Sequence, residues 1–398
     1  MILMFMHREV FMNRLDSVSM GKIVVIREKL LDAQRKGDKI FRFESGDPSF
    51  DVHPNIKAAM EKALRENKTH YIPNNGIPEL REALAHKLRT KNGLTKIEAK
   101  HVSVTNGAMH ALYVVYQCIV AEGDEVIVPD PMWTEAVEDA RLAGAVIVPI
   151  ELKPENNYVY AADEIAKKVT AKTKVIFLNT PHNPTGAIIP KSELEKIFAI
   201  AKKHDLWIVS DEAYEDVLFD GGSHTSIGSI DPSYEKLISV YSYSKSYAMS
   251  GLRVGYFATL HPLFNDRASK LLRCTVNGIN SVAQWGALAA LKEVDQSWFD
   301  EMNAEYLKRR DLFLKILSEQ KVLTPFAPKG AFYLWCRHNS EVNATALSEK
   351  LADLGIGNAP GDCFGSSGES LRSIRFAFSC STKMIEEGSE PLIKALNS

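Results

Sequence analysis

Short apolar segments of strand length alternate with longer segments of helical pattern between about residues 54 and 292. Such an alternation is typical of a mostly parallel sheet that is covered by helices on both faces. The segments with the clearest pattern are 125–128, 146–150, 175–178 and 208–209 for strands, and 108–120 and 133–142 for helices. We therefore expect an α/β fold for this part of the chain.

After residue 292 the rhythm changes, which predicts a second, smaller α+β unit. Its expected elements are a charged helix at 298–318, a strand at 331–336, a helix at 345–354, a strand at 373–378 and a final helix from about residue 382. A length of 398 residues is too great for one ordinary core and indicates two domains. No flexible linker is evident, so we expect continuous helix to join the domains.

Charge and cysteine usage exclude several classes of protein. The chain has 48 basic and 50 acidic residues, with a formal net charge of -2, so nothing in its charge favours nucleic acid or an anionic membrane as partner. Its five cysteines form no C-x-x-C pair, which indicates neither a disulfide framework nor a metal site. We expect a small-molecule substrate and a reducing cytoplasm.

No segment predicts membrane insertion or export. The apolar opening, Met1 to Met6, is too short for a signal core and lacks a basic start and a cleavage site. The longest mainly apolar run, Ala111 to Ala121, contains Gln117 and is too short to span a bilayer. We therefore expect a soluble protein.

The most informative local stretch is Tyr241-Ser242-Tyr243-Ser244-Lys245, followed by Arg253. It places an amine between hydroxyl groups and a guanidinium, just after an expected strand. A lysine is a useful covalent catalyst only in its neutral form, and a Schiff base to an aldehyde keeps it so. The hydroxyl of Ser242 and the guanidinium of Arg253 are suited to a phosphate. By itself, S-x-S-K is also compatible with a solvated surface lysine.

Other polar residues follow the ends of expected strands. Asn183-Pro184-Thr185-Gly186 comes after the apolar run 174–179, and Asp211 and Tyr214 come after 206–209. Open parallel sheets bind ligands at such strand ends. Asn106-Gly107-Ala108-Met109 opens an expected helix, where backbone N–H groups can approach a phosphate. Arg375 is one charge in an apolar strand and needs a partner.

Together these residues resemble the class I aminotransferases of the pyridoxal-phosphate fold type I superfamily, in the aspartate, aromatic and alanine subgroup. The resemblance runs from about Ser45 to the C-terminus. Eight motifs carry it in one order: S-G-D-P-S-F-D at 45–51, Y-I-P-N-N-G-I-P-E-L-R-E-A-L at 71–84, H-N-P-T-G at 182–186, S-D-E-A-Y at 210–214, S-Y-S-K at 242–245, G-L-R-V-G-Y at 251–256, G-A-F-Y at 330–333 and I-R-F-A-F at 374–378.

The resemblance implies a fold and a division into domains. It implies a large cofactor-binding domain, residues 54–292, with a mostly parallel seven-stranded sheet. It also implies a smaller domain made of residues 1–53 and 293–398, with the active site between the two. As in the family, a homodimer with two shared active sites is expected.

The resemblance further implies pyridoxal 5'-phosphate as cofactor, with Lys245 as the residue that forms the Schiff base and then moves a proton between the substrate Cα and the cofactor. Asp211 would face the pyridine nitrogen and keep it protonated. Tyr214 and Asn183 would form hydrogen bonds to the ring oxygen. Without the family context, Asp211 is equally well a turn cap, and Asn183-Pro184 equally well a turn.

The remaining cofactor contacts are implied in the same way. Trp133 would stack on the cofactor ring, although a tryptophan is more often a core residue. The phosphate would be bound by Gly107, Ala108, Met109, Ser242, Ser244, Arg253 and Tyr71, with the tyrosine supplied by the neighbouring subunit.

Arg375 would bind the α-carboxylate of the substrate as a bidentate pair, assisted by Gly46 and Asn183. Holding the carboxylate near the ring plane leaves the Cα–H bond aligned with the π system, which favours deprotonation over decarboxylation. The alternative for Arg375 is an ion pair between the domains.

The substrates are left open. Met109 stands where relatives that act on acidic substrates carry a lysine, which weakens an assignment to aspartate alone and leaves aromatic and neutral donors open. By resemblance, 2-oxoglutarate is the expected acceptor. No motif before Ser45 identifies the residues that determine specificity.

Three alternative functions remain on the same residues. A carbon–sulfur β-lyase would release pyruvate and ammonia without a 2-oxo acid acceptor. A cofactor-sensing regulator would need an added DNA-binding module, for which the N-terminal segment is too short. An inactive homologue is disfavoured because all the catalytic side chains are present.

Overall fold

The computed structural model describes residues 14–18 and 21–397. The expectation for Met1 to Met6 therefore lies outside the described residues. Within the described part of the chain, no helix is both long enough and apolar enough to cross a membrane. In the same residues, His, Cys, Asp and Glu side chains form no group of three or more that could hold a metal ion.

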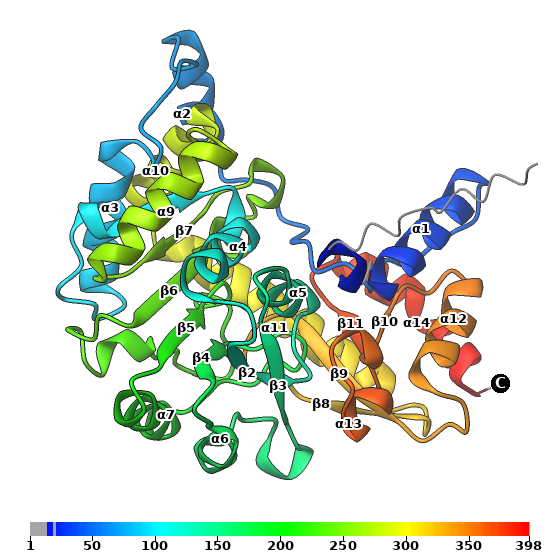
Figure 1. Ribbon diagram of the computed structural model, residues 1–398. Helices are drawn as coiled ribbons and strands as arrows, with labels where there is room; N and C mark the ends of the chain where they lie inside the picture. The colour runs from blue at the N-terminus through cyan, green and yellow to red at the C-terminus, as the bar shows by residue number, and fades with distance from the viewer. Residues whose placement is uncertain (1–13, 19–20, 398) are drawn as a thin grey trace, which may run out of the picture.

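A seven-stranded sheet forms the centre of the larger part of the molecule (Figure 1). Its strands are β1 (Val102–Thr105), β2 (Glu125–Asp130), β3 (Val146–Glu151), β4 (Thr173–Asn179), β5 (Trp207–Asp211), β6 (Leu237–Ser242) and β7 (Gly255–Ala258). They lie in the order β1-β7-β6-β5-β4-β2-β3. Strands β3, β2, β4, β5 and β6 are parallel, and β7 is antiparallel to both of its neighbours. This confirms the expected mostly parallel seven-stranded sheet.

Alternate residues of the central strands pack on opposite faces of the sheet. On one face, Val175 and Phe177 of β4 pack with α4 (Gly107–Ile119), α5 (Thr134–Leu142) and α9 (Pro262–Thr275). On the other face, Ile176 and Leu178 pack with α6 (Ala162–Lys168) and α7 (Lys191–Lys203). Because both faces are buried, these strands read as continuous apolar runs in the sequence.

Three further helices cover the end of the sheet that carries β1 and β7. These are α2 (Pro54–Arg65), α3 (Pro78–Thr90) and α10 (Ser281–Glu293). Their apolar residues form one cluster with Val102 and Val104 of β1 and Tyr256 of β7.

The C-terminal part builds a separate antiparallel sheet in the order β10-β11-β9-β8. Its strands are β8 (Leu323–Phe326), β9 (Tyr333–His338), β10 (Ala359–Pro360) and β11 (Ser373–Ala377). Around it lie α1 (Lys22–Arg35), α12 (Ala344–Asp353), α13 (Gly368–Leu371) and α14 (Thr382–Asn397). A smaller α+β domain is therefore present, and it includes the N-terminal helix α1. We keep the division at residues 54 and 292 as a proposal.

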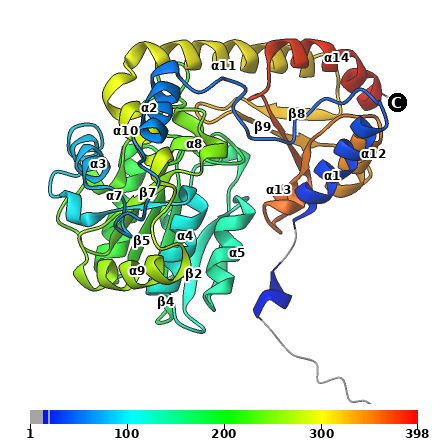
Figure 2. The same ribbon diagram turned by 90° about the horizontal axis from the view of Figure 1, so that it is seen from above.

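One long helix runs along both parts of the molecule. Figure 2 shows α11 (Gln296–Leu317) extending from the large sheet to the small one, where it meets α14. Its residues Met302, Tyr306 and Phe313 pack in one cluster with Val217 from the large part and Phe376 from β11. The helix therefore joins the two cores, as the pattern at 298–318 predicts.

The predicted elements exist, but some of their ends differ. The strand predicted from residue 331 begins at Tyr333, because Ala331 has a φ of 55°, in the left-handed region that a strand cannot contain. Trp133 is the residue that precedes α5 rather than its first helical residue. Lys245 lies in a single helical turn, α8 (Tyr243–Ser246), which the sequence pattern did not indicate.

Candidate active site

A cavity of about 300 Å³ opens where the carboxyl ends of the parallel strands face the small domain. Most of the residues predicted from the sequence line it: Gly46, Ala108, Met109, Trp133, Asn183, Asp211, Tyr214, Ser242, Ser244, Lys245, Arg253 and Arg375. They come from both domains. The fold therefore brings together side chains that are more than 300 residues apart in the chain.

Lys245 lies at the centre of this group. Helix α8 begins directly after β6, and the Ser242 hydroxyl caps it by accepting a hydrogen bond from the Ser244 N–H. The Lys245 Nζ donates a hydrogen bond of 2.6 Å to the Gly46 carbonyl oxygen. Burial lowers the pKa of Lys245 to about 8, although the Asp47 carboxylate acts in the opposite direction. Much of the amine is therefore neutral, and nucleophilic, slightly above neutral pH.

Asp211 is the last residue of β5, and its carboxylate is buried with few partners. One oxygen accepts the Ala213 N–H at 3.1 Å, which is the turn contact expected of a capping aspartate. By contrast, the neighbouring buried Glu212 is held by Ser226 and His224. Burial raises the pKa of the Asp211 carboxyl to about 7, and the Ala213 N–H opposes that rise. Asp211 therefore lines the cavity without an ion-pair partner among residues 14–18 and 21–397, although the charge of Lys245 acts on it from within the same cavity.

Two buried tyrosines stand beside these groups. The hydroxyl groups of Tyr214 and Tyr333 lie 2.7 Å apart. Burial raises the pKa of Tyr214 well above its ordinary value, so its hydroxyl stays protonated and can donate a hydrogen bond. A Cβ atom at Gly46 would lie 2.1 Å from the Tyr333 hydroxyl oxygen. Only a glycine therefore fits at position 46.

Arg375 of β11 points its guanidinium into the cavity. One terminal nitrogen donates to the Asn183 side-chain oxygen at 3.0 Å, and the other to the Glu44 carbonyl oxygen at 2.7 Å. The buried Nε has no partner. Among the described residues, Arg375 forms no ion pair, so the interdomain ion pair considered from the sequence is not observed there. Its charge is available to an anionic ligand.

The far end of the cavity is suited to an anion. The N-terminus of α4 presents the N–H groups of Gly107, Ala108 and Met109, which have no partner within the helix. The Arg253 guanidinium lies beside this turn, donating to the Ser250 and Asn106 carbonyl oxygens. A Cβ atom at Gly107 would lie 2.4 Å from the Arg253 Nη2. The missing side chain at Gly107 therefore leaves room for the guanidinium.

The structure does not bring Tyr71 to this cavity. Its side chain is 90% exposed and lines a separate surface hollow beside residues 277–282. Gly107 does not line the cavity wall itself but lies directly behind Arg253.

Several lining residues were not found from the sequence. Tyr333 lies in the quoted G-A-F-Y motif, which was the available signal. Glu135 follows Trp133 by two positions at the start of α5. Ile23 and Arg27 of α1 line the cavity mouth, and no motif marks them.

Comparisons with known proteins identify the family of this chain. The sequence pattern of the family "Aminotransferase class I and II" matches residues 38–392. The chain is 34% identical over 390 residues to the aspartate/prephenate aminotransferase of Thermus thermophilus, covering 96% of this chain and 98% of that protein. It is also 34% identical over 399 residues to aromatic-amino-acid aminotransferase 2 of Thermococcus litoralis, covering 96% and 97% of the two chains.

Solved structures give the same result. The T. thermophilus aspartate aminotransferase with maleate superposes with a TM-score of 0.91 at 32% identity, covering 96% of this chain and 98% of that one. The aromatic aminotransferase of Pyrococcus horikoshii superposes with a TM-score of 0.85 at 33% identity, covering 92% and 98%.

Proposed function

Since this chain belongs to the class I and II aminotransferases, we propose that the cavity binds pyridoxal 5'-phosphate and that Lys245 is the residue that attaches to it. The enzyme is a transaminase, and its relatives do not favour the carbon–sulfur lyase considered from the sequence. The observation that carries the cofactor proposal is the Lys245 amine, with its lowered pKa, in one cavity with the Asp211 carboxylate, which has no ion-pair partner among the described residues.

Both ends of the cavity fit this cofactor. The α4 N-terminus and Arg253 offer N–H donors and a cation to a phosphate, with Ser242 and Ser244 beside them. At the other end, a protonated pyridine nitrogen would give Asp211 an ion-pair partner. The half-buried Trp133 would supply a flat apolar face for the ring.

Bound pyridoxal phosphate supplies an aldehyde that condenses with amines and a pyridinium ring that accepts the electron pair left at Cα. Lys245 would take the proton from the substrate Cα and deliver it to the cofactor carbon that carried the aldehyde. Tyr214 and Asn183 would hold the ring oxygen by hydrogen bonds. Asp211 would hold the ring nitrogen in its protonated form.

Arg375 binds the substrate α-carboxylate with the donors that Asn183 and Glu44 already orient. The backbone of Gly46 closes the same end of the cavity. A fixed carboxylate leaves the Cα–H bond, rather than the bond to the carboxylate, aligned for cleavage. The site therefore favours amino transfer over decarboxylation, with an amino acid as donor and 2-oxoglutarate as acceptor.

We also propose a homodimer with shared active sites. Tyr71 is exposed and outside its own cavity, so it can reach a phosphate only in a neighbouring subunit. The five cysteines are free thiols, which fits our proposal of a cytoplasmic enzyme.

The test uses the purified protein with added pyridoxal phosphate. Borohydride reduction followed by peptide mass spectrometry should find the cofactor adduct at Lys245, and Lys245→Ala should show none. A screen of amino acids with 2-oxoglutarate should then yield glutamate. An adduct at another lysine, or pyruvate and ammonia formed without an acceptor, would overturn the proposal.

A further inference from the structure

Glu135 is a carboxylate in the wall of the active-site cavity that none of the steps above uses. It lies in the first turn of α5, two residues after Trp133. No described lysine or arginine forms an ion pair with it, although the Arg375 guanidinium is near enough to act on its charge. An acidic side chain in this position needs an explanation, because a half-buried carboxylate is costly without a partner.

The surroundings of Glu135 leave its charge incompletely balanced. Burial raises the pKa of its carboxyl, and the nearby Glu138 carboxylate acts in the same direction. A hydrogen bond from its own backbone N–H, the Arg375 guanidinium and the Trp133 side chain oppose this rise in the pKa but do not cancel it. A cationic group that entered the cavity would further stabilise the ionised form of the Glu135 carboxyl.

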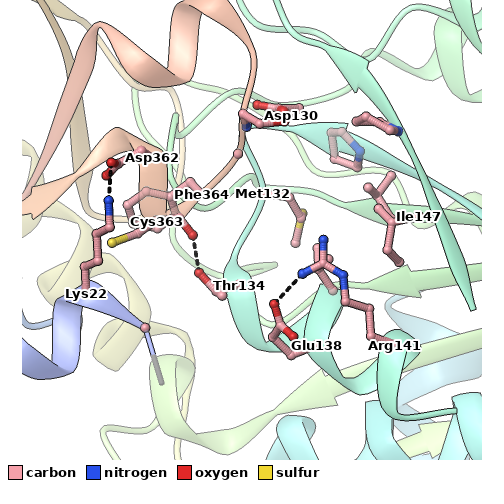
Figure 3. Close-up of a pocket in the computed structure, with 17 residues that line it drawn as sticks. Lys22, Asp130, Met132, Thr134, Glu138, Arg141, Ile147, Asp362, Cys363 and Phe364 are labelled. Carbon is pink, nitrogen blue, oxygen red and sulfur yellow. Dashed lines mark hydrogen bonds and ion pairs between the residues drawn. The ribbon is translucent and has the colours of Figure 1, made fainter. Parts of the chain in front are cut away.

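Glu138, one turn further along α5, gives a useful contrast. It lies in a neighbouring cavity of about 400 Å³, where Figure 3 shows it directed toward Arg141. The Arg141 guanidinium donates to one Glu138 oxygen at 2.6 Å. Lys22 and Asp362 pair in the same way across that cavity. Glu138 is therefore ion-paired within the protein, whereas Glu135 lines the active-site cavity without an ion-pair partner among the described residues.

The position of the substrate side chain follows by elimination, and this step rests on the proposed function. If Arg375 binds the α-carboxylate and Lys245 is at the amine, those parts of the wall are already occupied. The wall that remains for the side chain includes Ile23, Arg27, Met109, Trp133, Glu135 and Tyr333. Glu44 also lines the cavity, but its carboxylate pairs with Arg42 and its backbone oxygen accepts a hydrogen bond from Arg375. Of the two glutamates in the described lining, only Glu135 has no ion-pair partner among the described residues.

We propose that Glu135 selects amino donors that carry a cationic nitrogen on the side chain, an ammonium or a guanidinium group, over donors with a second carboxylate. A charge-assisted hydrogen bond to Glu135 strengthens the binding of the cationic donors, and charge repulsion weakens the binding of donors with a second carboxylate.

Arg27 explains how an acidic acceptor uses the same cavity. Arg27 lines the same cavity and has no ion-pair partner among the described residues. A transaminase takes donor and acceptor into one site in turn, so one anionic and one cationic wall residue serve a basic donor and an acidic 2-oxo acid.

The test compares ornithine with aspartate as donors to the holoenzyme at saturating 2-oxoglutarate. Glu135→Gln should lower kcat/KM for ornithine by about 10- to 100-fold and leave that for aspartate unchanged or higher. Glu138→Gln, on the same helix but in the neighbouring cavity, should leave the ratio of the two donors unchanged. If Glu135 only orients Trp133, its substitution will lower both donors equally, which would overturn the proposal.

A binding measurement separates this inference from the proposed reaction. Calorimetry should show that 4-guanidinobutanoate binds the holoenzyme more tightly than glutarate, and that Glu135→Gln reverses this order. Both ligands have the carboxylate that Arg375 would bind, and neither has an α-amine. If Glu135→Gln reverses the relative affinities of the two ligands but the enzyme transfers no amino group, the proposed reaction alone is wrong. If the enzyme transfers amino groups but Glu135→Gln leaves the relative affinities unchanged, the proposed role of Glu135 alone is wrong.

Discussion

The Arg253 guanidinium lies so close to Gly107 that a Cβ atom on the glycine would come within 2.4 Å of Nη2. Gly107 also has a φ of 86°, where a side chain is strained. Both constraints fit the proposed phosphate site, in which the first turn of α4 and the guanidinium face the same anion.

Gly107→Ala should therefore weaken cofactor binding, because the methyl group displaces Arg253 from the phosphate. We expect the dissociation constant of pyridoxal phosphate to rise by about tenfold or more, the equivalent of one charge-assisted hydrogen bond. Gly123→Ala is the matched control, since Gly123 has a φ of 83° but nothing within 4 Å of its added Cβ. Equal losses in the two variants would show that backbone strain, rather than crowding of Arg253, is responsible.

The lowered pKa of Lys245 predicts a pH dependence. In the apo-protein the rate of adduct formation depends on the neutral amine, so it should rise about tenfold per pH unit below pH 8 and level off above it. Asp47 opposes the lowering of the pKa, so Asp47→Asn should move the plateau to lower pH. Stopped-flow absorbance at a series of pH values measures both. A rise that continues to pH 10 would contradict the lowered pKa.

The ionised Asp211 carboxylate should lower the stability of the folded apo-protein, although the proposed reaction needs it. Its folded-state pKa of about 7 lies above the unfolded value, so the folded state binds the extra proton, and stability falls as pH rises from about 4 through 7. Asp211→Asn removes this charge. At pH 8 it should raise the melting temperature of the apo-protein by about 2 °C or more, with little effect at pH 4, while kcat falls by about 100-fold or more.

Thermal unfolding of the apo-protein at both pH values is the measurement. A variant that melts lower than the wild type at pH 8 would show that Asp211 already has a partner in the absence of cofactor.

Arg375→Lys should raise KM for amino-acid donors, because an ammonium cannot form the two parallel hydrogen bonds of a guanidinium. We expect kcat/KM to fall by about 100-fold. The matched control is Arg372→Lys, since Arg372 lies three residues earlier and its guanidinium donates to the Ser340 carbonyl oxygen at the surface. If Arg375 had a structural role alone, its substitution would lower the melting temperature and leave KM unchanged.

Sequence patterns predicted those elements in which successive residues along the chain are all buried or alternate regularly between buried and exposed. The strands β4 and β5 are buried on both faces, so their apolar runs are continuous, and Asn183 and Asp211, which follow or end these strands, line one cavity. Lys245, Arg253 and Arg375 lie in motifs that the family resemblance marked, and they line one cavity with those residues.

Residues that reach the cavity from distant segments were missed. Arg27 and Glu135 come from α1 and α5, and only the packing of the two domains places them in one wall. Neither belongs to a local pattern, because an arginine on an exposed helix and a glutamate in a first helical turn both have ordinary explanations. The turn of α8 around Lys245 was missed because four residues are too few to show a helical period.

Tyr71 offers the sharpest test of shared active sites. If Tyr71 acts across subunits, each active site combines Lys245 of one subunit with Tyr71 of the other. A hybrid dimer of a Tyr71→Phe and a Lys245→Ala subunit then contains one site with both substitutions and one site with neither. Unfolding and refolding a mixture of the two variants should therefore produce activity above that of either variant alone, whereas each variant refolded by itself should gain none. Because Tyr71 lies outside its own cavity in the single chain, activity that does not exceed the sum of the separate variants would show that no tyrosine crosses between subunits.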